Sequence, residues 1–573
     1  MRGFSRLAVL FLIAAPAFAQ APIDPAKLPA ETLLYIRSSG LKLQPDSAQK
    51  NSLLALWNDP DFAPVRAALF ESRAGGNEKE GKGARWTAAD FQRFLPLLEK
   101  PLIFGVLLRL PGSASGANDA SDKPSPTQVF AVYDDSGNEA LARAFLDRLH
   151  KTEAEPPQIS PVTIGSVRAE KVVRKSGTTY RAFLPGKLVI ATDEATLGDI
   201  LDRLPKGAKV VGLLGESSAF AEAQREVLPG NTLEFFLRVP DLAALAGSIH
   251  GPQAAQVQEL VKGLHTEAIH AVCASVSFDR AETRFHGAIL GDASAGTLFD
   301  IVPDGSARMA SLTLVPATAV SYNASQFDLL NFYHILRNTL EASLPPNQAG
   351  MIPMVEGMAA MKLGMPLESG LRVFSGEYAS FTSRDDFDPS GNVYAFGITS
   401  KPDGLKLVHS LATLAGDRVA ISDERDEGDT TFLGVSFSNQ KAAGTAQTKF
   451  WVALTPNFLL GSLQAETLHT LLAGKAAGSP RLASEPGFQQ ARSHFPEKVI
   501  GISYADFSRV NWAAALGHML EQVKSAQAAK GDASQETKVL ELFKPDVLRR
   551  HLHTTAGASW KDAHGVHFDG WIQ

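Results

Sequence analysis

Five methionines stand at regular spacing in the second half of the chain, and their sulfur atoms are the first candidates for chemistry. They are separated by three, four, three and four positions: Met351, Met354, Met358, Met361 and Met365. On an α-helix this spacing places all of them on one face. Such a face could bind Cu(I) through thioethers, present an adaptable surface to apolar ligands or partner helices, or pack into a core.

The first half of the chain favours the core interpretation of this methionine helix. Phe91, Phe94 and Leu98 stand where Met358, Met361 and Met365 stand in the sequence repeat described below. Aromatic and leucine side chains cannot bind copper, but they fill a core well. We therefore predict that the methionine helix packs against the core, and we assign it no metal.

Three short motifs resemble those of penicillin-binding proteins and serine β-lactamases. They are Ser47-Ala48-Gln49-Lys50, of the form S-x-x-K, Ser136-Gly137-Asn138, of the form S-x-N, and Lys175-Ser176-Gly177-Thr178, of the form K-[ST]-G. In such enzymes a lysine beside the serine on a helix activates it. The third motif is expected at a hairpin turn rather than on a strand that lines a site. We therefore assign no catalytic residue.

Histidines gather near the C-terminus, at His551, His553, His564 and His567. His551 and His553 are predicted to share one face of a strand, whereas His564 and His567 would point to opposite faces. A zinc site needs convergent ligands and outer-shell partners. The pattern therefore predicts surface histidines on a terminal hairpin rather than a metal site.

Two further candidates also receive structural interpretations. The loop from Asp386 to Gly391 imitates the opening of a calcium-binding loop, but its twelfth position is Gly397 instead of glutamate, so a hairpin loop is predicted. The single cysteine, Cys273, lies in an alternating run and is predicted to be a small buried side chain. The common nucleotide, zinc-protease and serine-hydrolase motifs are absent from the sequence. No cofactor is implied.

The elements that would position these residues occur twice in the same order. Tyr35 follows a Leu-Pro-Ala segment, and Tyr322 follows Val-Pro-Ala. Further matches keep the same order, while their separations drift as loop insertions would make them drift: Val129–Ala131 with Val393–Ala395, Leu188–Thr192 with Phe458–Ser462, Phe220 with Phe488, and Phe285 with Phe568. We predict a tandem duplication, with repeats at residues 20–300 and 301–573.

One unit is predicted to mix helices with an antiparallel sheet. Alternating strands are expected near Leu33–Ser38, Leu102–Leu110, Thr127–Tyr133, Val167–Val173, Thr179–Ile190, Thr232–Val239, Ala271–Asp279 and Arg284–Leu290. Helices are expected between them, including Glu194–Leu204 and Ser218–Val227. Short turns require antiparallel pairing, so the fold class is α+β with helices packed on the sheet.

The N-terminus and the composition indicate export. Arg2 and Arg6 precede an apolar run, and Ala17-Phe18-Ala19 fits a signal-peptidase site, so residues 1–19 are predicted to be a cleaved signal peptide. Formal net charge is −6 and no basic cluster is present, which makes nucleic acid an unexpected partner. No later segment is long and apolar enough to predict an integral membrane helix. The expected location is periplasmic or secreted.

The segment Leu28 to Thr32 reads Leu-Pro-Ala-Glu-Thr. It resembles an early motif of an uncharacterised family of bacterial exported proteins, and that resemblance implies no activity and no site residues. The sequence favours a non-catalytic binding or scaffolding protein of the cell envelope, with an unknown protein or apolar ligand as partner. A carrier of an apolar ligand or lipid, and a hydrolase of unrecognised type, are the alternatives.

Overall fold

The structure is a computed structural model that describes the chain from Ile23 onward, with internal gaps. The described residues are 23–40, 51–74, 87–109, 126–151, 155–204, 210–247, 258, 261, 266–278, 281–294, 298–305, 309–344, 348, 350–437, 448–528 and 535–573. The expected signal peptide (1–19) and the motif from Ser47 to Lys50 lie outside them.

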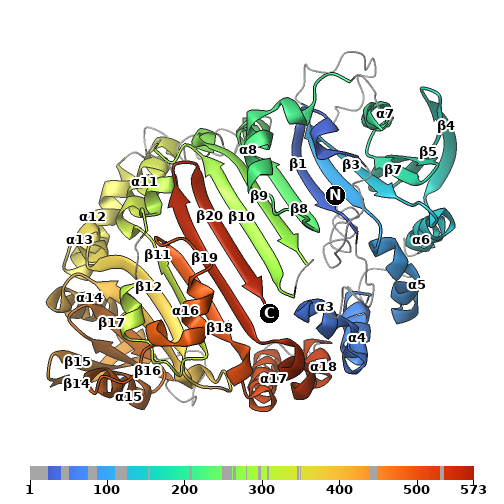
Figure 1. Ribbon diagram of the computed structural model, residues 1–573. Coiled ribbons are helices and arrows are strands. Elements are labelled where there is room, and N and C mark those ends of the chain that lie inside the picture. The colour runs from blue at the N-terminus through green and yellow to red at the C-terminus, as the bar shows by residue number, and fades with distance from the viewer. Residues whose placement is uncertain are drawn as a thin grey trace.

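Within the described residues, a single antiparallel sheet of 20 strands forms the framework of the fold (Figure 1). The strands of the first half are β1 (Thr32–Ser38), β2 (Leu102–Leu108), β3 (Thr127–Asp134), β4 (Gln158–Ile164), β5 (Val167–Arg174), β6 (Gly177–Leu184), β7 (Lys187–Ala191), β8 (Leu233–Arg238), β9 (Ile269–Ser277) and β10 (Thr283–Gly291). Their hydrogen-bonded order is β4-β5-β6-β7-β3-β2-β1-β8-β9-β10.

The strands of the second half follow the same order. They are β11 (Ser321–Gln326), β12 (Phe374–Thr382), β13 (Asn392–Ile398), β14 (Val419–Glu427), β15 (Thr430–Phe437), β16 (Thr448–Leu454), β17 (Phe458–Ser462), β18 (Gly501–Asp506), β19 (Thr554–Asp562) and β20 (Gly565–Ile572). Their order is β14-β15-β16-β17-β13-β12-β11-β18-β19-β20. Strand β14 thus stands where β4 stands, and β18 where β8 stands.

Strands β10 and β20 join the two halves at the middle of the sheet. Phe285 lies opposite Gly570, and Gly287 lies opposite Phe568. The rings cover the glycines so closely that a Cβ on Gly287 would lie 2.2 Å from Phe568, and one on Gly570 would lie 2.2 Å from Phe285. An aromatic ring over a strand glycine fills the space of the missing side chain and fixes the register. The two halves therefore meet through two equivalent Phe–Gly pairs.

One face of the sheet is covered by α7 (Glu194–Arg203) and α8 (Ser218–Glu226) in the first half, and by α15 (Ala465–Ala476) and α16 (Pro486–Arg492) in the second. Their apolar sides bury against the strands in two large clusters. Tyr35 and Tyr322 are fully buried at corresponding places in these clusters. Burial of such aromatic side chains supplies much of the driving force for packing the helices on this face.

Helices also cover outer parts of the opposite face. Helices α5 (Ala88–Leu98) and α6 (Glu139–Lys151) pack over β2, β3 and β7, while α14 (Lys401–Ala415) packs over β15 and β16. Strand β3 is therefore buried on both sides, which explains its continuous apolar run from Val129 to Tyr133.

Helices from the two halves also meet at one end of the sheet. Helices α3 (Ser52–Asn58) and α4 (Ala63–Ala74) share an apolar cluster with α17 (Trp512–Ala528), α18 (Gln535–Glu541) and α19 (Pro545–His551) (Figure 1). The buried carboxylate of Asp59 accepts from Arg550 at 2.7 Å and lies 2.8 Å from Nε2 of His551. The remaining α-helices of the described part of the chain are α9 (Pro240–Gly247), α11 (Leu329–Ser343), α12 (Met351–Leu363) and α13 (Leu367–Leu371).

The predicted mixture of helices with an antiparallel sheet is confirmed, with local corrections. Strand β4 was not predicted, because its residues are mostly exposed and carry no alternating apolar pattern. The single strand predicted over Thr179–Ile190 is two strands, β6 and β7, with Gly186 at φ +73° in the turn between them. The strand predicted to carry His551 is wrong, since His551 ends helix α19 and β19 begins at Thr554.

Candidate functional site

Helix α8 places a carboxylate over the middle of the sheet. Its buried side, Ala219, Phe220 and Ala223, packs on the sheet, and the Phe220 ring lies 6.3 Å from Tyr35 and 5.7 Å from Phe236. This anchoring fixes the helix, so Glu226 at its last position reaches over strand β10. The helix thus holds an acidic group at the joint between the halves.

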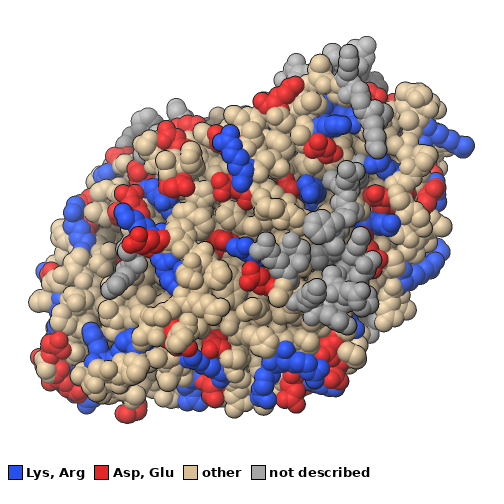
Figure 2. All heavy atoms as spheres, in the orientation of Figure 1, with Lys and Arg blue, Asp and Glu red and all other residues tan. Residues whose placement is uncertain are grey.

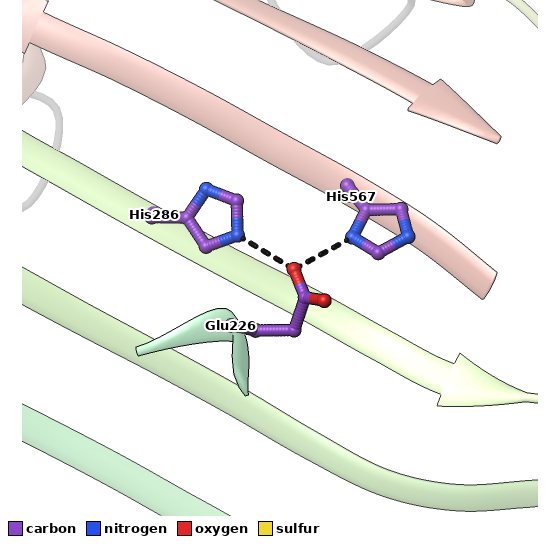
Figure 3. Close-up of side chains that lie close together, drawn as sticks. All are labelled: Glu226, His286 and His567. Carbon is purple, nitrogen blue, oxygen red and sulfur yellow. Dashed lines mark hydrogen bonds and ion pairs between the residues drawn. The ribbon is translucent and has the colours of Figure 1, made fainter. Parts of the chain in front are cut away.

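Two imidazole rings from neighbouring strands converge on that carboxylate (Figure 3). His286 lies on β10 and His567 on β20, and the register places both on the face that α8 covers. One oxygen, Oε2 of Glu226, lies 3.1 Å from Nε2 of His286 and 3.2 Å from Nδ1 of His567. The ligand atoms of the three side chains lie within 4.8 Å of one another. We call these residues the Glu–His–His cluster.

Its surroundings bury and orient the rings of the cluster. His567 is 3% exposed, and the Trp560 ring stacks on it at 5.4 Å between centroids. The second nitrogen of His567, Nε2, lies 3.1 Å from Oδ1 of Asp562. His567 therefore faces a carboxylate at each ring nitrogen. A neutral imidazole carries a single N–H, so it can donate to only one of them.

Neighbouring groups have pKa values that fit this arrangement. Desolvation alone would raise the pKa of Asp562, but hydrogen bonds from the His564 backbone and from His567 hold that pKa below its ordinary value. Burial, together with the charge of Glu226, raises the pKa of the Cys273 thiol to about 12. Cys273 is buried, as its alternating pattern predicts, and it stays a protonated thiol, which is a poor metal ligand.

A second group of possible metal ligands, Asp386, Asp388 and His518, already has a positively charged side chain, Arg384, as its partner. Both oxygens of Asp386 accept from Arg384, at 3.0 and 2.6 Å, and that pairing holds the pKa of Asp386 far below its usual range. Asp388 caps the backbone of Ser390 at 2.9 Å. These bonds close a connection between β12 and β13, in agreement with the predicted hairpin loop.

The methionine helix is α12, and the prediction that it packs into the core is wrong for most of its stripe. Met351, Met354, Met358 and Met361 are 46%, 56%, 47% and 79% exposed, and Met365, beyond the helix end, is 9% exposed. The sequence match with the first half suggested a buried helix face, but Phe94 on α5 is buried whereas Met361, its counterpart in that match, is exposed. A periodic apolar face can be exposed for binding as well as buried.

Helix α11 extends the exposed apolar surface. Phe332, Leu336 and Leu340, spaced at four residues, are each more than 40% exposed, as is Val355 on α12. We call these residues, together with Met351, Met354, Met358 and Met361, the α11–α12 apolar face. Monomeric proteins rarely leave large apolar patches exposed unless the patch binds something, so these exposed apolar side chains on two neighbouring helices mark a candidate binding surface.

Polar groups lie between the two helices of this face. Glu356 on α12 accepts from Tyr333 at 2.5 Å and from Nε of Arg337 at 2.7 Å, both on α11. Desolvation and the hydrogen bond to Glu356 raise the pKa of Tyr333 to about 12, so the phenol remains a donor. Helices α11 and α12 are therefore joined by polar contacts, while the apolar side chains named above are exposed, although a surface helix usually turns such side chains toward the core.

The other sequence candidates stay apart. Ser136 lies in the turn before α6, and Lys175, 86% exposed at the β5–β6 turn, pairs with Glu155 at 3.8 Å. No interaction joins Ser136 to Lys175 in the described part of the chain. His553 and His564 are exposed. Of the C-terminal histidines only His567 enters the cluster, and its partners, Glu226 and His286, could not be linked to it without knowing that β10 pairs with β20.

Surface charge, helix hydropathy and similarity to known proteins point to no further site. Lys and Arg are interspersed with Asp and Glu over the viewed face (Figure 2). Within the described residues, every helix is too short or too polar to cross a bilayer. No family model, curated protein or solved structure matches the chain.

Proposed function

We propose that this chain is an exported, non-catalytic binding protein of the cell envelope, and that it binds its partner through the α11–α12 apolar face. The observation that carries the proposal is the set of exposed apolar side chains on α11 and α12, two helices that Glu356 joins through Tyr333 and Arg337. Burial of a methionine side chain in a complex is worth roughly 1.5–3 kcal/mol, so a few of these residues suffice for specific binding.

Methionine at this face suggests the kind of partner. Its unbranched thioether side chain adapts to different shapes, and methionine-rich surfaces bind amphipathic helices. Exposed apolar side chains recur at helical spacing on both α11 and α12, and surfaces of this kind receive the apolar side of an amphipathic helix. We therefore propose an amphipathic helix of another envelope protein as the partner.

The architecture supports a further part of the proposal, a tandem duplication with repeats at 20–300 and 301–573. Each half has the same strand order, and matched residues lie on corresponding elements: Tyr35 and Tyr322 on β1 and β11, Phe285 and Phe568 on β10 and β20, and Phe220 and Phe488 on α8 and α16. The duplication would have left α11 and α12 of the second unit free to specialise in binding, since Phe94 and Leu97 on α5 of the first unit are buried.

Photo-crosslinking in intact cells tests the binding proposal. A photoreactive phenylalanine analogue at position 358 should give one discrete protein adduct, because that side chain lies within the apolar face. The same analogue at position 211, where Val211 is 86% exposed in the first half, is the matched control and should give none. A lipid adduct at position 358 would instead favour the carrier of apolar ligands. Equal labelling from both positions would contradict a specific face.

A further inference from the structure

The Glu–His–His cluster carries an inference that is independent of the apolar face. We propose that Glu226, His286 and His567 bind one Zn²⁺ ion between helix α8 and the centre of the sheet. Two imidazoles and one carboxylate form a ligand set that zinc uses in proteins, with a fourth position left for water. The ion would be held by residues from both halves of the chain.

The distances suit such an ion. Tetrahedral zinc with bonds of about 2.0–2.1 Å has its ligand atoms roughly 3.3 Å apart. The two nitrogen-to-oxygen distances in the cluster are 3.1 and 3.2 Å. All three ligand atoms already lie within 4.8 Å of one another, so only small rotations of the side chains are needed.

The two carboxylates that flank His567 are a second, independent observation. Nδ1 faces Glu226 and Nε2 faces Asp562, and a neutral ring has one N–H, so only one of the two carboxylates can accept from it. With an ion between His567 and Glu226 both contacts are satisfied, because Nδ1 offers its lone pair to the metal and Nε2 donates its hydrogen to Asp562. A carboxylate behind a metal-bound histidine is the usual outer-shell arrangement in zinc sites, where it fixes the ring and its tautomer.

Other histidine–glutamate pairs in the described residues lack these features. Nδ1 of His270 lies 3.1 Å from Oε2 of Glu222, one turn earlier on α8 than Glu226, but the side chains are 42% and 37% exposed. Among the described residues, no second histidine joins His270 and Glu222 in a group of possible metal ligands. This pair has the same residue types, helix and distance, so it is a matched control for the cluster.

Calorimetric titration of the untagged mature chain with Zn²⁺, after removal of metals with EDTA, tests the proposal. The wild-type protein should bind one ion per chain, and Co²⁺ should give the intense visible absorption of a tetrahedral complex. Glu226→Gln and His286→Gln should each weaken Zn²⁺ binding more than about 100-fold, and Asp562→Asn by roughly 10–100-fold. His270→Gln should leave the affinity unchanged.

Two further readouts separate loss of the site from loss of the fold. Zn²⁺ should raise the melting temperature of the wild type but not of Glu226→Gln, which alters a side chain that is 27% exposed at a helix end. Co²⁺ should quench Trp560, which stacks on His567, and Trp560→Phe should remove that quenching while calorimetric binding persists. Absence of binding at millimolar Zn²⁺, or equal affinity in wild type and in folded Glu226→Gln, would overturn the proposal.

Discussion

Gly565→Ala is expected to lower the free energy of unfolding by roughly 3–5 kcal/mol, because it combines backbone strain with a steric clash. Gly565 begins β20 with φ +144°, a conformation that residues with a Cβ rarely adopt. An added Cβ would lie 2.0 Å from the carbonyl oxygen of Ile289 on β10. Backbone cannot rotate away as a side chain can, so the clash would push apart the strands that join the two halves.

Gly428→Ala is the control for strain alone. Gly428, in the β14–β15 turn, has φ +64°, and an added Cβ would meet no atom within 4 Å. It should cost about 1 kcal/mol. Urea unfolding in the presence of EDTA measures both variants without a contribution from metal. Similar losses in the two proteins would show that the β10–β20 joint is not the tightly packed contact described above.

Met365→Ala should cost about 2–5 kcal/mol, whereas Met361→Ala should change the free energy of unfolding by no more than about 0.5 kcal/mol. Met365 packs with Leu363, Val373, Ile398 and Leu407, and its removal would leave a cavity there. Met361 is 79% exposed, and alanine is at least as good a helix former as methionine. The same urea experiment compares the two variants directly.

A large loss of stability from Met361→Ala would contradict an exposed α12 and restore the core interpretation of the stripe. Met361→Leu is a useful companion, since it keeps the apolar surface and removes the sulfur. We expect it to preserve both stability and partner binding, because the proposed interaction depends on apolar contact rather than on metal ligation.

Much of the fold was predictable because its strands either alternate between apolar and polar residues or are continuous apolar runs between turns. Helices α7 and α8 were predicted from their periodic apolar residues. Strand β4 was missed because neither of its faces is consistently apolar, so the pattern that identifies strands is absent there. The connection at Gly186 was missed because the flanking residues read as one continuous strand.

The candidate sites were harder to predict from the sequence, for two physical reasons. Periodicity shows that the methionines share a helix face, but an exposed binding face and a buried one have the same period. The Glu–His–His cluster depends on contacts between residues far apart in the chain, and those contacts exist only because β10 pairs with β20 beneath α8. The alternation of side chains along a strand gave one clue to His567. It places His567 on the opposite face of the strand from its neighbours Val566 and Phe568, and Phe568 is exposed.

The proposed cover of the α11–α12 apolar face by a partner in the cell envelope can be measured directly by methionine oxidation. Dilute hydrogen peroxide converts accessible methionines to sulfoxides, which peptide mass spectrometry counts. In the purified protein, Met354 and Met361 should oxidise quickly while Met309, 1% exposed, stays intact as the internal control for folding. In intact envelopes the same residues should be protected several-fold. Equal oxidation of Met354 and Met361 in envelopes and in purified protein would contradict the account.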